Sequence, residues 1–171
     1  MDEAHNPYRG PQAEVTGNAD GDVPAGRGER LLATLLDAVL VLLLLGPLLL
    51  LGGYWQRALE AARAGQALPL SITLSWALVG FLVFAAVQGY PLAVSGQTWG
   101  KRALGLRMVD MAGRQPSFAR LLGLRYGVRY ALANVPLAGP LLHLGNVLLI
   151  FRADRRCGHD LVAGTRVVKR G

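Results

Sequence analysis

The chain has 171 residues, of which 52% are hydrophobic and only 17% are charged. Ordinary soluble domains carry about 25% charged residues, so this chain lacks the polar surface that a soluble protein of its size needs. A single cysteine, Cys157, excludes an internal disulfide framework. The composition indicates a small membrane protein with room for one membrane domain. The net charge of +7 indicates contact with anionic lipid headgroups rather than with nucleic acid.

The first segment, residues 1–29, is polar and rich in glycine and proline. It has too few apolar residues to build a core, so we expect a disordered tail. It also lacks the apolar stretch of a cleavable signal peptide. The membrane domain is therefore expected over residues 30–171.

Two apolar stretches predict firm transmembrane helices. The first runs from Leu31 to Leu51, and its 21 residues span about 31 Å as a helix, which matches a hydrocarbon core of about 30 Å. The second runs from about Ile72 to Val94, inside a region without any Asp, Glu, Lys or Arg. Residues 52–69 form a short connection between the two helices.

A third apolar stretch, Tyr130 to Phe151, allows two interpretations. One straight crossing would place the tail after it outside the cell, although that tail holds six basic residues. Because basic segments stay in the cytoplasm, we favour a helical hairpin broken by proline at 134–140, with arms at about 117–133 and 140–151. Seven basic residues within 95–129 place that segment in the cytoplasm too, so both termini are predicted to be cytoplasmic.

Two short segments flank the hairpin and have the character of β-strands. Leu104 to Asp110 alternates roughly between apolar and polar residues, and Gly164 to Lys169 is rich in β-branched residues. We expect these segments to pair as a small cytoplasmic sheet.

Asp37 is the most informative single residue. An aspartate this deep in a leucine-rich helix costs about 2–3 kcal/mol, so it needs a partner or a function. Arg30 lies nearly two helical turns earlier on the same face, and Arg125 and Arg129 lie one turn apart on the hairpin. We therefore predict that Asp37 pairs with one of these arginines. The pair is either structural or part of a site that binds a proton or a cation.

The segment that holds Cys157, His159 and Asp160 contains residue types that bind metals. It lacks the spacing of a four-ligand zinc site, so we expect neither a metal nor a cofactor here. The simpler interpretation is a polar loop in which Asp160 accepts hydrogen bonds. Serine, histidine and cysteine do not cluster as in nucleophilic catalysis, so an enzyme is not expected either.

Three separated motifs resemble the RDD family of bacterial membrane proteins, which is named for one arginine and two aspartates. Arg30 and Asp37 open the first predicted transmembrane helix, residues 96–110 (GQTWGKRALGLRMVD) follow the second, and residues 159–168 (HDLVAGTRVV) close the chain. By position, the name-giving residues are Arg30, Asp37 and Asp160. The resemblance covers about residues 28–169. It implies an inner-membrane protein with several helices, and transport, including cation/proton antiport, has been suggested for some members.

Together these observations predict an all-α polytopic membrane protein of the bacterial inner membrane, with a small β pairing. The expected function is transport of ions or small solutes, with the intramembrane aspartate paired to arginine. The alternative is a non-catalytic membrane scaffold or assembly factor. The expected partners are the lipid bilayer, with anionic headgroups at the basic loops, and a second copy or another membrane protein, because the chain is small for a complete transporter. The candidate polar cluster consists of Arg30, Asp37, Arg125, Arg129 and Asp160.

Overall fold

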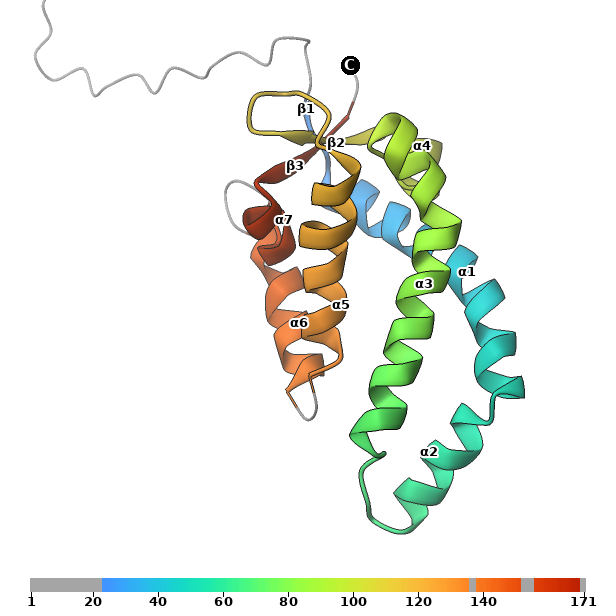
Figure 1. The fold of residues 1–171 in the computed structure, drawn as a ribbon. Helices are drawn as coiled ribbons and strands as arrows, with labels where there is room; N and C mark the ends of the chain where they lie inside the picture. Colours follow the sequence, from blue (N-terminus) through green and yellow to red (C-terminus); the bar gives the residue numbers. More distant parts are fainter. Residues whose placement is uncertain (1–22, 136–137, 152–155, 170–171) are drawn as a thin grey trace, which may run out of the picture.

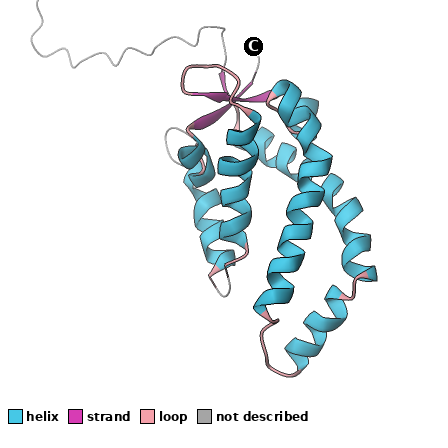
Figure 2. Ribbon diagram, viewed as in Figure 1, coloured by secondary structure: helices cyan, strands magenta, loops and turns pink. Residues whose placement is uncertain are grey.

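The computed structural model of the protein describes residues 23–135, 138–151 and 156–169. They form a mostly helical fold with a small sheet at one end (Figures 1 and 2). The helical elements are α1 (Arg27–Leu51), α2 (Tyr54–Arg63), α3 (Leu70–Ser95), α4 (Trp99–Ala103), the π-helical segment η1 (Arg120–Gly127), α5 (Val128–Ala133), α6 (Gly139–Leu148), the 3-10 turn η2 (Leu149–Phe151) and α7 (Gly158–Ala163). The strands are β1 (Val23–Pro24), β2 (Leu106–Asp110) and β3 (Thr165–Lys169).

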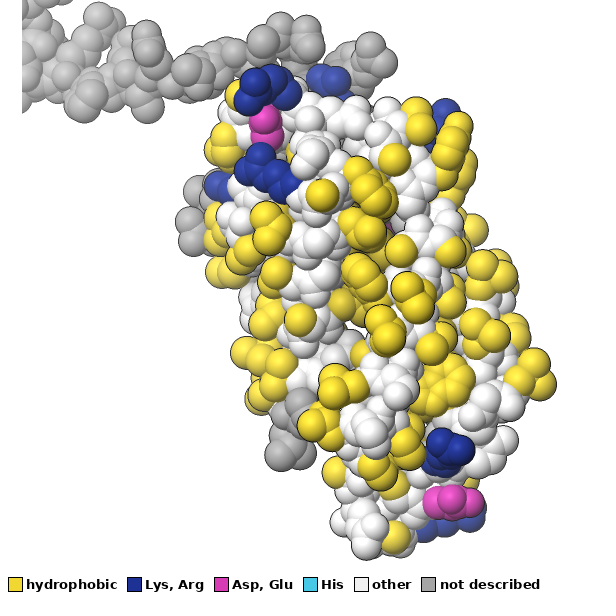
Figure 3. Space-filling view, in the orientation of Figure 1, with side chains coloured by type: hydrophobic (Ala, Val, Ile, Leu, Met, Phe, Trp, Pro, Cys, Tyr) yellow, Lys and Arg dark blue, Asp and Glu magenta, His cyan; other side chains and the backbone are white. Residues whose placement is uncertain are grey.

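Helices α1 and α3 are long and apolar enough to cross a membrane. They have 25 and 26 residues, and only 11% of the most apolar window of each is buried within the protein. A core helix of a soluble protein would be mostly buried, whereas these two present leucines outward. Figure 3 shows hydrophobic side chains over the long flank of the molecule, with charged side chains gathered at its two ends. Both helices cover the predicted apolar stretches, and the connection between them contains α2.

Part of the predicted N-terminal tail belongs to a strand and a helix. We expected residues 1–29 to be disordered, but Val23 and Pro24 form β1 and α1 already begins at Arg27. The physical reason is the free edge of β3, which β1 covers: Val23 pairs with Lys169, and the Ala25 amide donates to the Val167 carbonyl at 3.2 Å. Residues 1–22 of the predicted tail lie outside the described residues.

The predicted sheet is present and has one additional strand. Strands β2 and β3 pair antiparallel, with Met108 opposite Val167, and the strand order is β1-β3-β2. Met108 and Val167 are buried, so one face of the sheet packs onto the helices. The sheet thus joins the beginning, the middle and the end of the described chain at one end of the molecule (Figure 1).

The third apolar stretch folds as a hairpin and not as one straight helix. In Figure 1, η1 and α5 run toward the end that is far from the sheet, and α6 returns beside them. Asn134 follows the last residue of α5, and Pro140 lies in the first turn of α6, where proline fits because the missing amide would be unpaired anyway. Pro136, part of the predicted break, lies outside the described residues.

The buried core lies at the sheet end of the helices. It combines Ala33 of α1, Phe84 and Leu92 of α3, and Leu121 and Tyr126 of η1 with buried residues of the sheet. The polar residues described below are embedded in this part of the molecule.

Candidate functional site

Asp160 of α7 is the centre of a buried ion-pair cluster. Its side chain is inaccessible to solvent, and Arg30 Nη2 donates to Asp160 Oδ2 at 2.6 Å. Arg125 forms a second ion pair, through Nη1, with Oδ1. Oδ2 also accepts the Cys157 amide at 3.2 Å, which caps the first turn of α7. One carboxylate therefore joins α1, η1 and α7.

Arg125 is the most deeply buried cation of the described residues, with 2% of its surface exposed. Its Nη1 donates to Thr165 Oγ1 at 2.5 Å, which ties η1 to the sheet. Arg125 lies in the π-helical segment. Such turns are rare in proteins, and those that occur are often found at functional sites.

The electrostatics of α7 follow from this cluster. Burial raises the pKa of Asp160, but the nearby guanidinium groups of Arg125 and Arg30 outweigh burial and lower that pKa to about 2. Burial and the Arg125 charge lower the pKa of His159 to about 3, so this imidazole is neutral at neutral pH. Burial also raises the pKa of the Cys157 thiol.

Asp37 of α1 is the centre of a second cluster. Its Oδ1 accepts from the Gly100 amide at 2.7 Å and from Gln88 Nε2 at 3.0 Å. Its Oδ2 accepts from Thr98 Oγ1 at 2.5 Å and lies 3.6 Å from Lys101 Nζ. The aspartate thus holds α4 against α1 and α3.

Asp37 forms an ion pair, but the prediction that its partner is an arginine was wrong. The cation that forms its ion pair is Lys101, whereas Arg30 and Arg125 pair with Asp160. Arg30 and Asp37 are both buried residues of α1, but the acid that forms an ion pair with Arg30 comes from α7, 130 residues later.

Gly100 explains how a backbone amide reaches the Asp37 carboxylate. A Cβ at this position would collide with the Ala33 carbonyl oxygen and lie 2.9 Å from Asp37 Oδ1. Only glycine therefore lets α4 approach α1 this closely.

Two cavities border the clusters. One, called the Asp37 cavity here, has a volume of about 420 Å³ between α1, α3 and the hairpin; its polar lining residues include Asp37, Arg129, Asn134 and His143. The other, called the arginine cavity here, has a volume of about 310 Å³ and lies between the start of α1, η1, α5, the end of α6 and α7. Arg129 lines both cavities. Among the described residues it makes no hydrogen bond or ion pair.

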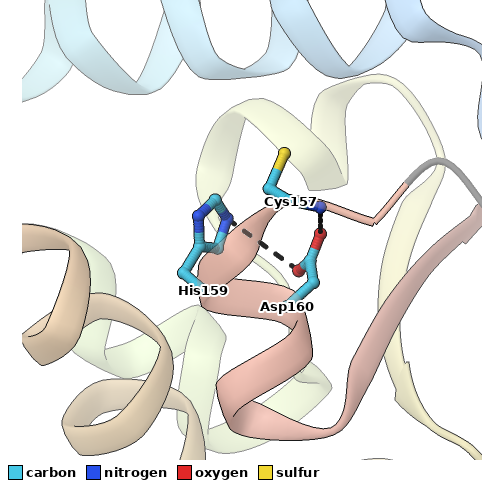
Figure 4. Close-up of side chains that lie close together, drawn as sticks. All are labelled: Cys157, His159 and Asp160. Atoms are coloured by element: carbon cyan, nitrogen blue, oxygen red, sulfur yellow. Dashed lines mark hydrogen bonds and ion pairs between the residues drawn. The ribbon is translucent and has the colours of Figure 1, made fainter. Parts of the chain in front are cut away.

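Cys157, His159 and Asp160 come together as the sequence motif suggests, with potential ligand atoms within 4.8 Å of one another. Figure 4 shows the three side chains around the first turn of α7. Their donor atoms are already engaged: Asp160 by two arginines, Cys157 Sγ by Arg30 at 3.8 Å, and His159 Nδ1 by Asn146 Nδ2 at 3.0 Å. A metal cation here would face the two guanidinium groups, so this donor set does not fit a metal ion.

The five residues of the predicted cluster divide between the two centres. Arg30, Arg125 and Asp160 form one, Asp37 belongs to the other, and Arg129 lies at the boundary of the two cavities. Sequence reasoning missed the partners of Asp37, which are Gln88, Thr98, Gly100 and Lys101. Three of them lie in the GQTWGK motif at residues 96–101, whose identity was visible although its contact with Asp37 was not.

The chain is similar to known proteins over most of its length. The family model of the RDD family matches residues 24–164. A protein of Haemophilus influenzae described as an uncharacterized protein is 39% identical over 93 residues, which is 54% of this chain. The chain covers 57% of that relative's length. No solved structure matches the chain.

Proposed function

Because the chain belongs to the RDD family, we propose that it is a multi-pass protein of the bacterial inner membrane that transports a small ion or solute through the Asp37 cavity, not an enzyme. Helices α1 and α3 supply two spans of sufficient length, and their outward leucines suit contact with lipid. The chain is small for a transporter, so the active form is an oligomer or a complex with another membrane protein.

The charge distribution supports an orientation with the sheet in the cytoplasm. Basic side chains of the sheet end include Arg107, Arg114, Arg120, Arg166 and Lys169. Positive charge near membrane segments favours the cytoplasmic side. Helix α1 begins and strand β3 ends in this region, which supports the proposal that both termini are cytoplasmic.

The observation that carries the transport proposal is the position of Asp37 on a cavity wall. A purely structural ion pair inside a membrane protein is expected to be dry, whereas this carboxylate borders a cavity of about 420 Å³. Arg129, His143 and Asn134 on the same wall offer further polar groups to a solute. Tyr126 and Phe84 supply apolar surface next to them.

Purified protein in proteoliposomes tests the proposal. Sodium, potassium and proton gradients are imposed in turn, and flux is followed for the wild type, Asp37→Asn and Asp37→Glu. The Asn variant keeps the shape of the side chain but cannot ionise, so flux and its pH dependence should disappear while the protein still inserts. Asp37→Glu should keep part of the activity. Undiminished flux through Asp37→Asn would exclude Asp37 as the coupling group.

A scaffold role is the second candidate, and the Asp160 cluster favours it. That carboxylate is inaccessible and clamps three elements, as expected of a purely structural device. Absence of flux in the wild type under every gradient, with the protein correctly inserted, would favour the scaffold.

A further inference from the structure

The arginine cavity has an unusually one-sided lining. Five cationic residues contribute to its wall, and no acidic residue is among the described residues that line it. The cations are Arg27, Arg30, Lys101, Arg125 and Arg129. The rest of the wall is mainly apolar, with Leu31, Val147 and Phe151.

Three of these cations have acidic partners among the described residues. Asp160 pairs with both Arg30 and Arg125, and Asp37 pairs with Lys101. These two carboxylates therefore serve three of the cations, whereas Arg129 has no acidic partner among the described residues. His159, which also lines the cavity, is neutral and adds no charge.

Two guanidinium groups have unused donors. Arg129 makes no hydrogen bond or ion pair among the described residues, although it lies on the hairpin between apolar helices. Only 2% of the surface of Arg125 is exposed, yet its Nε has no hydrogen-bond partner in the described part of the chain. Unsatisfied buried donors are costly, so a ligand that accepts from them would be stabilised.

We propose that the arginine cavity binds a phosphate group, with Arg129 as its principal contact. Guanidinium groups donate two parallel hydrogen bonds to phosphate oxygens, and basic pockets between membrane helices on the cytoplasmic side are typical sites for phospholipid headgroups. The volume of about 310 Å³ is large enough for such a group. The phosphate belongs either to a membrane lipid or to a free phosphate compound. This inference does not depend on transport through the Asp37 cavity.

The test measures binding to the full-length protein in a neutral detergent. Thermal unfolding is followed while inorganic phosphate is added, and separately while phosphatidylglycerol or phosphatidylcholine is added to the micelles. Native mass spectrometry counts the lipid molecules that stay bound. The test variant is Arg129→Gln. The control is Arg57→Gln, which also removes one positive charge but lies on the exposed surface of α2, far from the sheet end (Figure 1).

Wild type and Arg57→Gln should be stabilised by inorganic phosphate or by phosphatidylglycerol. Arg129→Gln should bind the same probe about tenfold more weakly or worse. Stabilisation by inorganic phosphate identifies a free phosphate compound. Stabilisation by phosphatidylglycerol alone, in preference to phosphatidylcholine, identifies an anionic lipid.

Equal binding by Arg129→Gln and Arg57→Gln would overturn the proposal, as would a wild type that neither phosphate nor phosphatidylglycerol stabilises. If Arg129→Gln does not fold, Arg129→Lys replaces it. This variant keeps the charge but loses the paired donors, so its affinity should fall by about threefold or more. Unchanged affinity in the folded Lys variant together with no lipid preference in the wild type would equally overturn the proposal.

Discussion

Arg30 at the start of α1 and Asp160 in α7 are 130 residues apart in sequence, and their side chains form a buried ion pair of 2.6 Å. Arg125 of η1 contacts the same carboxylate from the other side. Because each of these elements is short or has an outer face of exposed apolar side chains, this cluster stabilises the packing of the hairpin and the C-terminal segment against α1.

Loss of Asp160 should be far more damaging than loss of Arg30. Asp160→Ala leaves Arg125 buried without a counter-charge, which costs about 3–5 kcal/mol. Arg30→Gln removes one cation, but Asp160 keeps its ion pair with Arg125. Thermal unfolding in detergent should therefore show a much larger loss for Asp160→Ala. Equal losses in the two variants would contradict the shared-carboxylate arrangement.

The stability of the fold should fall in mild acid because of His159. The pKa of His159 is about 3 in the folded protein, whereas its ordinary value, taken for the unfolded chain, is 6.5. Between about pH 3 and pH 6.5 the unfolded chain therefore binds a proton that the folded protein does not bind. The stabilisation is fully present above pH 6.5 and is lost as the pH falls toward about 3. Unfolding temperatures measured across this window should drop for the wild type.

His159→Gln is the control for this pH dependence, because it cannot take up a proton. Its unfolding temperature should change less over the same window, whatever its value at neutral pH. Parallel curves for wild type and His159→Gln would show that another group causes the acid sensitivity.

Several features of the fold were predictable from local patterns. The lengths of the apolar stretches predicted α1 and α3, and β-branched residues predicted β3. The six basic residues of the C-terminal tail, together with Pro140, predicted the hairpin. These signals depend only on neighbouring residues and on the membrane environment. The resemblance to the RDD family singled out Arg30 and Asp160, but it did not indicate that their side chains form an ion pair.

The partners of Asp37 could not be predicted in the same way. Helical spacing compares residues of one helix, whereas Lys101 reaches Asp37 only because α4 folds back onto α1 at Gly100. Strand β1 was missed for a related reason, since Val23 and Pro24 are extended only by pairing with the distant β3.

The ion pair of Asp37 with Lys101 can be tested with a double variant. Asp37→Ala leaves the Lys101 ammonium, in a residue that is 6% exposed, without its counter-charge. Asp37→Ala combined with Lys101→Met should recover part of the lost stability, because the second change removes the uncompensated charge. The yield of monodisperse folded protein and its unfolding temperature measure this. No recovery in the double variant would mean that Lys101 is not the charge partner.

Gly100→Ala should separate α4 from α1. The added methyl group collides with the Ala33 carbonyl, which costs about 1–3 kcal/mol as overpacking and weakens the Gly100 amide bond to Asp37. Gly89→Ala in α3 is the matched control, because a Cβ there meets nothing within 4 Å. Thermal unfolding should show a loss for Gly100→Ala only. An equal loss of stability in Gly89→Ala would contradict the claim that the close approach of Gly100 to Ala33 requires glycine.

The most direct test of the central claim asks whether water reaches Asp37 from within the membrane region. Ala38 lines the Asp37 cavity, whereas its neighbour Val39 is 55% exposed at the same depth and is not part of the cavity wall. Ala38→Cys and Val39→Cys are made in a Cys157→Ser background and exposed, in membranes, to a small charged thiol reagent. Transport through the cavity predicts modification of Cys at position 38 and protection at position 39, which faces lipid. Protection of both positions would show a dry cavity and contradict the transport account.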